Sequence, residues 1–156
     1  MTWWTLSLLS QGALAIYTQV VEWVDLFPWN DLSHGNGQET ADVALGITQA
    51  GLIYGTWRRS RRVLATAPAL YGLWLAAQVA TWWQGYLVAP NPDAVPRVYQ
   101  RYFSRTYRFL PPRGNRIVPD ANHVVLQIGI VVTLVCTLQA WRENRLCPRA
   151  CKCRPL

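Results

Sequence analysis

Residues 63–88, VLATAPALYGLWLAAQVATWWQGYLV, form the longest stretch of the chain without an acidic or basic side chain. Four arginines, within RRSRR at positions 58–62, directly precede it. An α-helix of about 20 residues crosses the roughly 30 Å of hydrocarbon in a membrane. A soluble core helix of this length would carry a polar face, whereas this stretch has only single polar residues such as Gln78. The stretch therefore predicts a membrane-spanning helix.

Three other apolar segments accompany this one, at about residues 3–24, 41–57 and 121–141. The first has tryptophans near both ends, as expected where a helix leaves the membrane. With 156 residues, the chain has room for one domain and none for a soluble domain beside the spans. We therefore predict an all-α membrane protein, a four-transmembrane-helix bundle that forms a single domain over residues 1–141. Its spans are about 3–24, 41–57, 63–88 and 121–141.

Small side chains predict where two of these helices pack together. Gly51 and Gly55 stand four residues apart in the second segment, a spacing that lets two helix backbones approach closely. Gly72, Ala76 and Ala80 form a ridge of small residues along the third segment. We expect this ridge to be the packing partner of the two glycines.

Polar side chains of the first segment lie on one helical face. Gln11, Thr18, Glu22 and Asp25 are spaced 7, 4 and 3 residues apart, which places them on one side of a helix. Polar groups within a membrane are costly to expose to lipid. We therefore expect this face to be turned toward other helices or toward water.

Every predicted span contains a glutamine, and two interpretations of these residues stay open. In the first, the amides form hydrogen bonds between helices, each worth about 0.6–2 kcal/mol. In the second, they line a site for a small hydrophobic ligand such as a quinone, sterol or lipid, with tryptophan walls. The candidate ligand-binding residues are Gln49, Gln78, Trp82 and Gln127.

The connection before the last span contains a second amphipathic pattern. Its arginines recur every three or four residues, with aromatic and apolar residues between them, and they are Arg97, Arg101, Arg105 and Arg108. Pro96 is placed to start a helix, and two prolines at 111–112 stop it. We predict an amphipathic interfacial helix at about 96–110, whose arginines bind anionic lipid headgroups.

The charge distribution predicts the orientation. The net charge is +7, and all fifteen basic residues lie after position 57. Four spans place both termini on one side, and nine Lys and Arg residues fall on that side against six on the other. Basic residues are enriched on the cytoplasmic side, so the termini are expected in the cytoplasm and the protein in an inner or plasma membrane. The arginines lie at membrane boundaries, which favours lipid headgroups over nucleic acid as partners.

Most other ionisable groups gather at one predicted membrane face, formed by the loops 26–40 and 89–120. Seven of the eight carboxylates and both histidines lie there. In one interpretation, the carboxylates pair with loop arginines and tie the two loops together. In a second, they form a divalent-metal or acid–base site with a histidine, although no HExxH or ExxH spacing is present. In a third, Glu22 belongs to a proton or ion pathway. The candidate catalytic residues are Glu22, Asp25, Asp31, His34 and His123.

The remaining segment, residues 142–156, is predicted as a basic, irregular tail that contains Cys147, Cys151 and Cys153. These thiols could bind a soft metal or be acylated near the membrane, but they match no specific template, and the favoured interpretation is a tail with incidental cysteines. No metal site and no particular cofactor is predicted.

The function is less well determined than the fold. No Ser-His-Asp order, glycine-rich phosphate loop or dinucleotide fingerprint is present, which favours a non-enzymatic role. The first hypothesis is an accessory subunit or partner-binding membrane protein, working with a protein partner or as a homo-oligomer. The alternative is a binder of a lipid-like or quinone-like small molecule, or a membrane enzyme, with its polar site at the face formed by the loops 26–40 and 89–120.

Overall fold

The computed structural model describes residues 1–33, 39–88, 99, 103, 105–114 and 116–146. Within these residues the chain is all-helical and contains no strand, as predicted. Its long helices are α1 (Trp3–Trp23), α2 (Glu39–Trp57), α3 (Arg61–Val79) and α6 (Ala121–Leu146). A π-helical turn, η1 (Ala80–Gln84), and the short helix α4 (Gly85–Leu87) continue α3.

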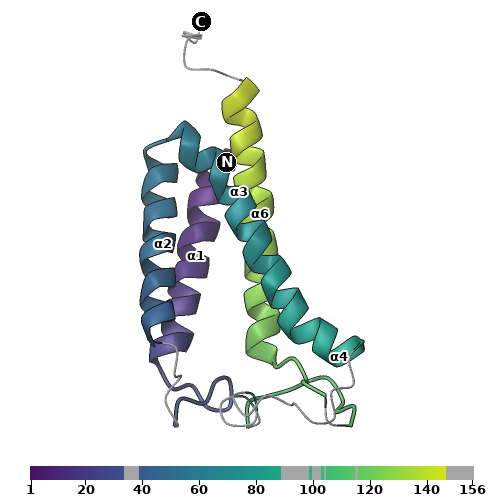
Figure 1. Ribbon diagram of the computed structural model, residues 1–156. Coiled ribbons are helices and arrows are strands. Elements are labelled where there is room, and N and C mark those ends of the chain that lie inside the picture. The colour runs from purple at the N-terminus through teal and green to yellow at the C-terminus, as the bar shows by residue number, and fades with distance from the viewer. Residues whose placement is uncertain (34–38, 89–98, 100–102, 104, 115, 147–156) are drawn as a thin grey trace, which may run out of the picture.

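The long helices alternate in direction (Figure 1). The tight turn between α2 and α3 lies at one end of the molecule, which we call the turn end. Residues 24–33, 105–114 and 116–120 lie at the opposite end, which we call the loop end. Two helical stretches in the described residues, Arg61–Leu87 and Ala121–Arg145, are long and apolar enough to cross a membrane. The helices α1 and α2 are not among them.

The core contains apolar side chains from all four long helices. Its buried residues are Leu14, Leu52, Ala67, Tyr71, Leu126 and Ile130. The helix α6 packs along both α1 and α3, while α2 packs mainly on α1. The outer surface is also apolar, and its most exposed large side chains include Ile16, Ile47 and Leu73.

Buried polar side chains join α1 to α2. The amide of Gln11 donates to the hydroxyl oxygen of Thr56 at 3.1 Å, and the hydroxyl of Thr18 donates to Oε1 of Gln49 at 3.0 Å. All four side chains are at most 2% exposed. The inner part of the polar face predicted for the first helix therefore does face a neighbouring helix, whereas Asp25 lies beyond the end of α1 and is exposed.

The turn end holds α2 and α3 together through a close backbone approach. The helix α2 ends in a Schellman motif, in which the amide of Ser60 donates to the carbonyl of Gly55 and the amide of Arg59 to that of Thr56. Arg59 has the left-handed conformation that this motif requires, with φ of 51°. A Cβ atom added at Gly55 would lie 2.4 Å from a methyl group of Val63. Only glycine allows this contact.

The prediction that the small-residue ridge of the third segment packs against both glycines is wrong. A Cβ atom at Gly51 or at Gly72 would meet nothing within 4 Å, and Ala76 and Ala80 are exposed. The two helices touch at Gly55 and then separate toward the loop end (Figure 1). The ridge thus lies beyond the point where α2 could reach it.

The interfacial helix predicted at 96–110 lies largely outside the described residues, but its last part, 105–110, is described and is not helical. Tertiary hydrogen bonds replace the helical ones there. The amide of Tyr107 donates to the carbonyl of Pro28, and the carbonyl of Tyr107 accepts from the amide of Ala121. Residue 107 thereby bridges two distant segments, which a continuous helix to Leu110 would prevent.

The tail predicted to be irregular from residue 142 begins as a helix, because α6 continues to Leu146. No helix-breaking residue occurs before Pro148, so nothing in the local sequence stops α6 earlier. The guanidinium of Arg145 lies 4.8 Å from the centre of the Trp141 ring, one turn back on the same face. The rest of the tail, with its three cysteines, lies outside the described residues.

Gly55→Ala is expected to lower the free energy of unfolding by about 1–3 kcal/mol, because the added methyl group overlaps Val63. Gly51→Ala is the matched control, since it lies one turn away in open space. The control should be neutral or slightly stabilising, as alanine is the better helix former. Thermal unfolding in detergent solution measures both, and equal stabilities of the two variants would contradict the contact.

Candidate functional site

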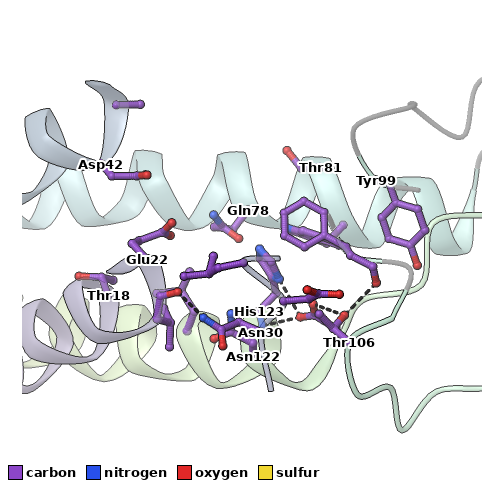
Figure 2. A pocket seen from close by; sticks show the side chains of 18 of the residues that line it. Thr18, Glu22, Asn30, Asp42, Gln78, Thr81, Tyr99, Thr106, Asn122 and His123 are labelled. Carbon is purple, nitrogen blue, oxygen red and sulfur yellow. Dashed lines mark hydrogen bonds and ion pairs between the residues drawn. The ribbon is translucent and has the colours of Figure 1, made fainter. Parts of the chain in front are cut away.

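A cavity of about 550 Å³ opens at the loop end of the helix bundle. Its walls come from the last turns of α1, the first turns of α2 and α6, the second half of α3 with η1, and the loop segments (Figure 2). The cavity follows from the arrangement of the helices. Because α2 and α3 meet only near Gly55 and then diverge, a space remains at the other end between α3 and the pair formed by α1 and α2.

The lining of this pocket changes from polar to apolar with depth. On three helices, a polar lining residue lies near the loop end, and an apolar lining residue lies on the same face one turn farther from that end. The polar residues nearer the loop end are Asp42 on α2, Gln78 on α3 and His123 on α6. The apolar residues one turn deeper are Leu45, Trp74 and Leu126. On these three helices the lining therefore changes from polar at the mouth to apolar at the floor. On α1 the deeper residue, Thr18, is polar, and its hydroxyl donates to Gln49.

Asp120 and His123 form the best-defined polar pair of the pocket. Asp120 is the residue before α6, and its carboxylate accepts the backbone amide of His123 at 2.9 Å, as a helix N-cap does. The Nδ1 atom of His123 lies 2.7 Å from the same carboxylate oxygen, and the hydroxyl of Thr106 donates to the other oxygen at 2.8 Å. Asp120 is 1% exposed. It thus joins the loop segment to α6 and orients the imidazole.

The environment of Asp120 has opposing effects on its acidity. Burial by itself raises the pKa of the carboxyl group, but the hydrogen bonds and charge of His123, together with the hydroxyl of Thr106, outweigh it and leave the pKa below its usual value. Because His123 lines the pocket, its oriented imidazole can contact a molecule bound there.

Aromatic side chains form the wall beside His123. The ring of Trp82 lies 3.8 Å, centre to centre, from the imidazole, and 5.2 Å from the ring of Phe103, which it meets edge to face. Tyr99 adds a third ring at 6.1 Å from Trp82. Trp82 belongs to η1, where the π-helical turn shifts the side-chain register relative to α3. That shift accompanies the inward position of Trp82, which is 5% exposed.

Several residues selected from the sequence line this one pocket. They are Glu22, Asp31 and His123 from the catalytic candidates, and Gln78 and Trp82 from the ligand-binding candidates. Asp25 is exposed outside the pocket, and His34 lies outside the described residues.

The remaining ligand-binding candidates connect helices instead. Gln49 accepts from Thr18, and Oε1 of Gln127 accepts from the indole of Trp83 at 2.7 Å. Neither lines the pocket. The hydrogen-bonding interpretation of the glutamines therefore describes Gln49 and Gln127, while the ligand-lining interpretation still describes Gln78.

Two of the four arginines expected to bind lipid headgroups are described by the structure. Arg97 and Arg101 lie outside the described residues. Arg105 forms an ion pair with Asp31 at 3.5 Å, and its side chain is 58% exposed, so solvent screens this pair. The guanidinium of Arg108 lies 5.6 Å from the centre of the Tyr99 ring. Both described arginines thus contact the protein itself, and the pair of Arg105 with Asp31 connects the two loops.

Three polar residues around the pocket were not identified from the sequence. Asn30 closes the end of α1, because its amide donates to the carbonyls of Val21 and Val24 and its Oδ1 accepts the amide of Leu26. Thr106 supports Asp120, and Asn122 accepts the hydroxyl of Tyr17 from α1. None of these three stands out in the sequence, whereas their neighbour Asp120 does, since an aspartate just before a helix is a typical N-cap.

Within the described part of the chain, no three His, Cys, Asp or Glu side chains gather closely enough to hold a metal ion. Cys136 is a buried free thiol in α6. No protein-family model, curated protein or solved structure matches the chain.

Asp120→Asn should reduce stability near neutral pH, and the deficit should shrink in acid. Because the pKa of Asp120 is lower in the folded state, its charge contributes stability that is complete above the unfolded value of 3.8. This contribution is lost as the pH falls through the folded pKa. Unfolding temperatures of both proteins in detergent across an acidic pH series measure the effect.

The control for this series is Asp25→Asn, at the exposed carboxylate near the same end of the molecule. It should differ little from wild type at any pH. A deficit of Asp120→Asn that does not change with pH would contradict the electrostatic role of the carboxylate.

Proposed function

We propose that this chain is an integral membrane protein of four transmembrane helices that binds a small amphiphilic molecule in the pocket at the loop end. The main support for this proposal is that the pocket lining changes from polar at the mouth to apolar at the floor. A molecule with a polar head and an apolar tail, such as a lipid or a quinone, matches that order. The proposal takes up the second of the two functions considered from the sequence.

The distribution of polar and apolar groups supports the membrane assignment. Two helical stretches have the length and composition of spans, and α1 and α2 run beside them with 21 and 19 residues, close to the roughly 20 that a span needs. Ile16 and Ile47 on these two helices are 68% and 69% exposed, while the polar pairs between them are buried. Apolar groups outside and paired polar groups inside are typical of helices in lipid.

The position of the pocket suits a molecule that enters from the membrane. Its charged and histidine residues on α1, α2 and α6, which are Glu22, Asp42 and His123, lie within about a turn of the loop-proximal ends of these helices, at the expected level of the lipid headgroups. Its apolar residues lie deeper, at the level of the acyl chains. A bound amphiphile would thus keep the depth that it has in the bilayer, so little of its surface would change environment on binding.

The first hypothesis, an accessory subunit or partner-binding protein, stays a prediction. So do a homo-oligomer and the contact of the loop arginines with anionic headgroups. None of these conflicts with a ligand in the pocket, because the apolar outer surface of the bundle is separate from the pocket lining.

We propose that the termini face the cytoplasm, because more basic residues lie at the turn end and in the tail than at the loop end. A reporter enzyme that is active only in the cytoplasm, fused after Leu156, should then be active. The same reporter inserted in the loop after Ser33 should be inactive. The reverse pattern would overturn this orientation.

Leu45→Trp is expected to displace the bound molecule, because the larger side chain fills the floor of the pocket. Ile47→Trp is the matched control, since residue 47 is on the same helix and points outward. Native mass spectrometry of protein extracted gently from its own membranes should find an added small-molecule mass on wild type and on the control, and little on Leu45→Trp. Bare wild-type protein, or equal loading of all three, would contradict the proposal.

A further inference from the structure

We infer that the head of the bound molecule is a cationic amine. This inference rests on the proposed function, and it concerns which amphiphiles the pocket selects. Three features of the pocket favour a positively charged hydrogen-bond donor: the chemistry of the polar lining, an amide oxygen without a partner, and the aromatic wall.

The polar lining at the mouth includes several groups that can only accept hydrogen bonds. Four carboxylates contribute to it, from Glu22, Asp31, Asp42 and Asp120, and none of the described lining residues is a lysine or arginine. All four carboxylates interact with other protein groups, Asp120 with His123 and Asp31 with Arg105 among them. A carboxylate has about four lone-pair positions, so these interactions leave room for a donor from the ligand.

Gln78 adds an acceptor that the protein does not use. Its Oε1 atom is buried, and the side chain makes no hydrogen bond to any described residue. Gln11, Gln49 and Gln127, in contrast, each make one hydrogen bond to a side chain of a different helix, although the other amide atom of each is buried without a partner. Gln78 and Glu22 instead both reach into the pocket, from α3 and α1 (Figure 2). A buried carbonyl oxygen without a partner is unfavourable, so a donor on the ligand would stabilise the complex.

The aromatic side chains of the pocket also favour a cationic amine head. Trp74, Trp82, Tyr99 and Phe103 all line the pocket. The faces of aromatic rings attract cations that come within about 6 Å, and tryptophan attracts them most strongly. Aromatic rings beside carboxylates are a combination that binds alkylammonium groups.

Other heads fit less well. An anionic head would be repelled by the carboxylates at the mouth. A neutral alcohol could donate to Gln78, but it would gain neither the charge-assisted hydrogen bond nor the cation–π attraction. The pocket should therefore distinguish amphiphiles by the charge of the head even when their tails are identical.

The test uses three probes with the same twelve-carbon chain: dodecylamine, dodecanol and dodecanoate. Each is titrated into the full-length protein in a neutral maltoside detergent near pH 7, and binding is measured by native mass spectrometry. Dodecylamine should bind about tenfold or more tightly than the other two, because only its head is charged and donating. Leu45→Trp should abolish this binding, whereas Ile47→Trp should not.

Two further variants locate the selectivity. Glu22→Gln removes one charge at constant size, and Gln78→Leu removes the unused acceptor at similar volume. Each should reduce the preference for dodecylamine over dodecanol severalfold and leave dodecanol binding nearly unchanged. If one variant does not fold, the other supplies the comparison. Unchanged preference in a folded variant would contradict the role of that residue.

The outcomes distinguish failure of the cationic-head inference from failure of the proposed function. If all three probes bind equally and Leu45→Trp blocks them all, the pocket binds amphiphiles and the inference of a cationic head is wrong. If dodecanoate binds most tightly, the inference is also wrong. If no probe binds in a way that Leu45→Trp blocks, the proposed function itself fails.

Discussion

The contact between Gly55 and Val63 is the constraint on which the rest of the structure depends. It brings α2 and α3 together at the turn end, closer than any side chain at residue 55 would allow. Buried hydrogen bonds hold α2 against α1, and α6 packs along α1 and α3. Because α2 is held to α1 while α3 is held to α6, α2 and α3 diverge toward the loop end. The pocket is the space that this separation leaves.

Asp120 has the corresponding role at the loop end. One buried carboxylate caps α6, orients the ring of His123 and binds the hydroxyl of Thr106. The neighbouring backbone of Tyr107 bridges the loop after α1 and the start of α6. These bonds bring residues 28, 107 and 121 together, although they are far apart in the chain. They keep the loop segments over the mouth of the pocket, where a bundle with free loops would open to solvent.

The chemistry of the pocket results from how paired polar groups are distributed. Inside a membrane, a polar side chain is tolerated when another protein group satisfies it. Gln11, Gln49 and Gln127 each meet this requirement in part, through one hydrogen bond to a neighbouring helix. Gln78 has no such bond, and its Oε1 atom lies at the wall of the pocket. The divergence that creates the cavity therefore also leaves an acceptor in its wall, which connects the shape of the site to its preference for a donor.

The amino-acid sequence by itself determined the helices and part of the site. Long uncharged segments have few alternatives to a helix, so the bounds of α1 and α2 and the start of α6 follow closely from composition, and the polar spacing of α1 identified its inner face. Glu22, Gln78, Trp82 and His123 were found because polar and aromatic groups are unusual near apolar segments. The tertiary structure alone decided which of them meet. Residues 22, 78 and 123 share a pocket because α3 leans away from α2, and that angle depends on one glycine–valine contact between helices. The predicted helix near 105–110 is absent for the same kind of reason, since hydrogen bonds to distant segments compete there with local helical bonds, and only the folded chain contains those partners.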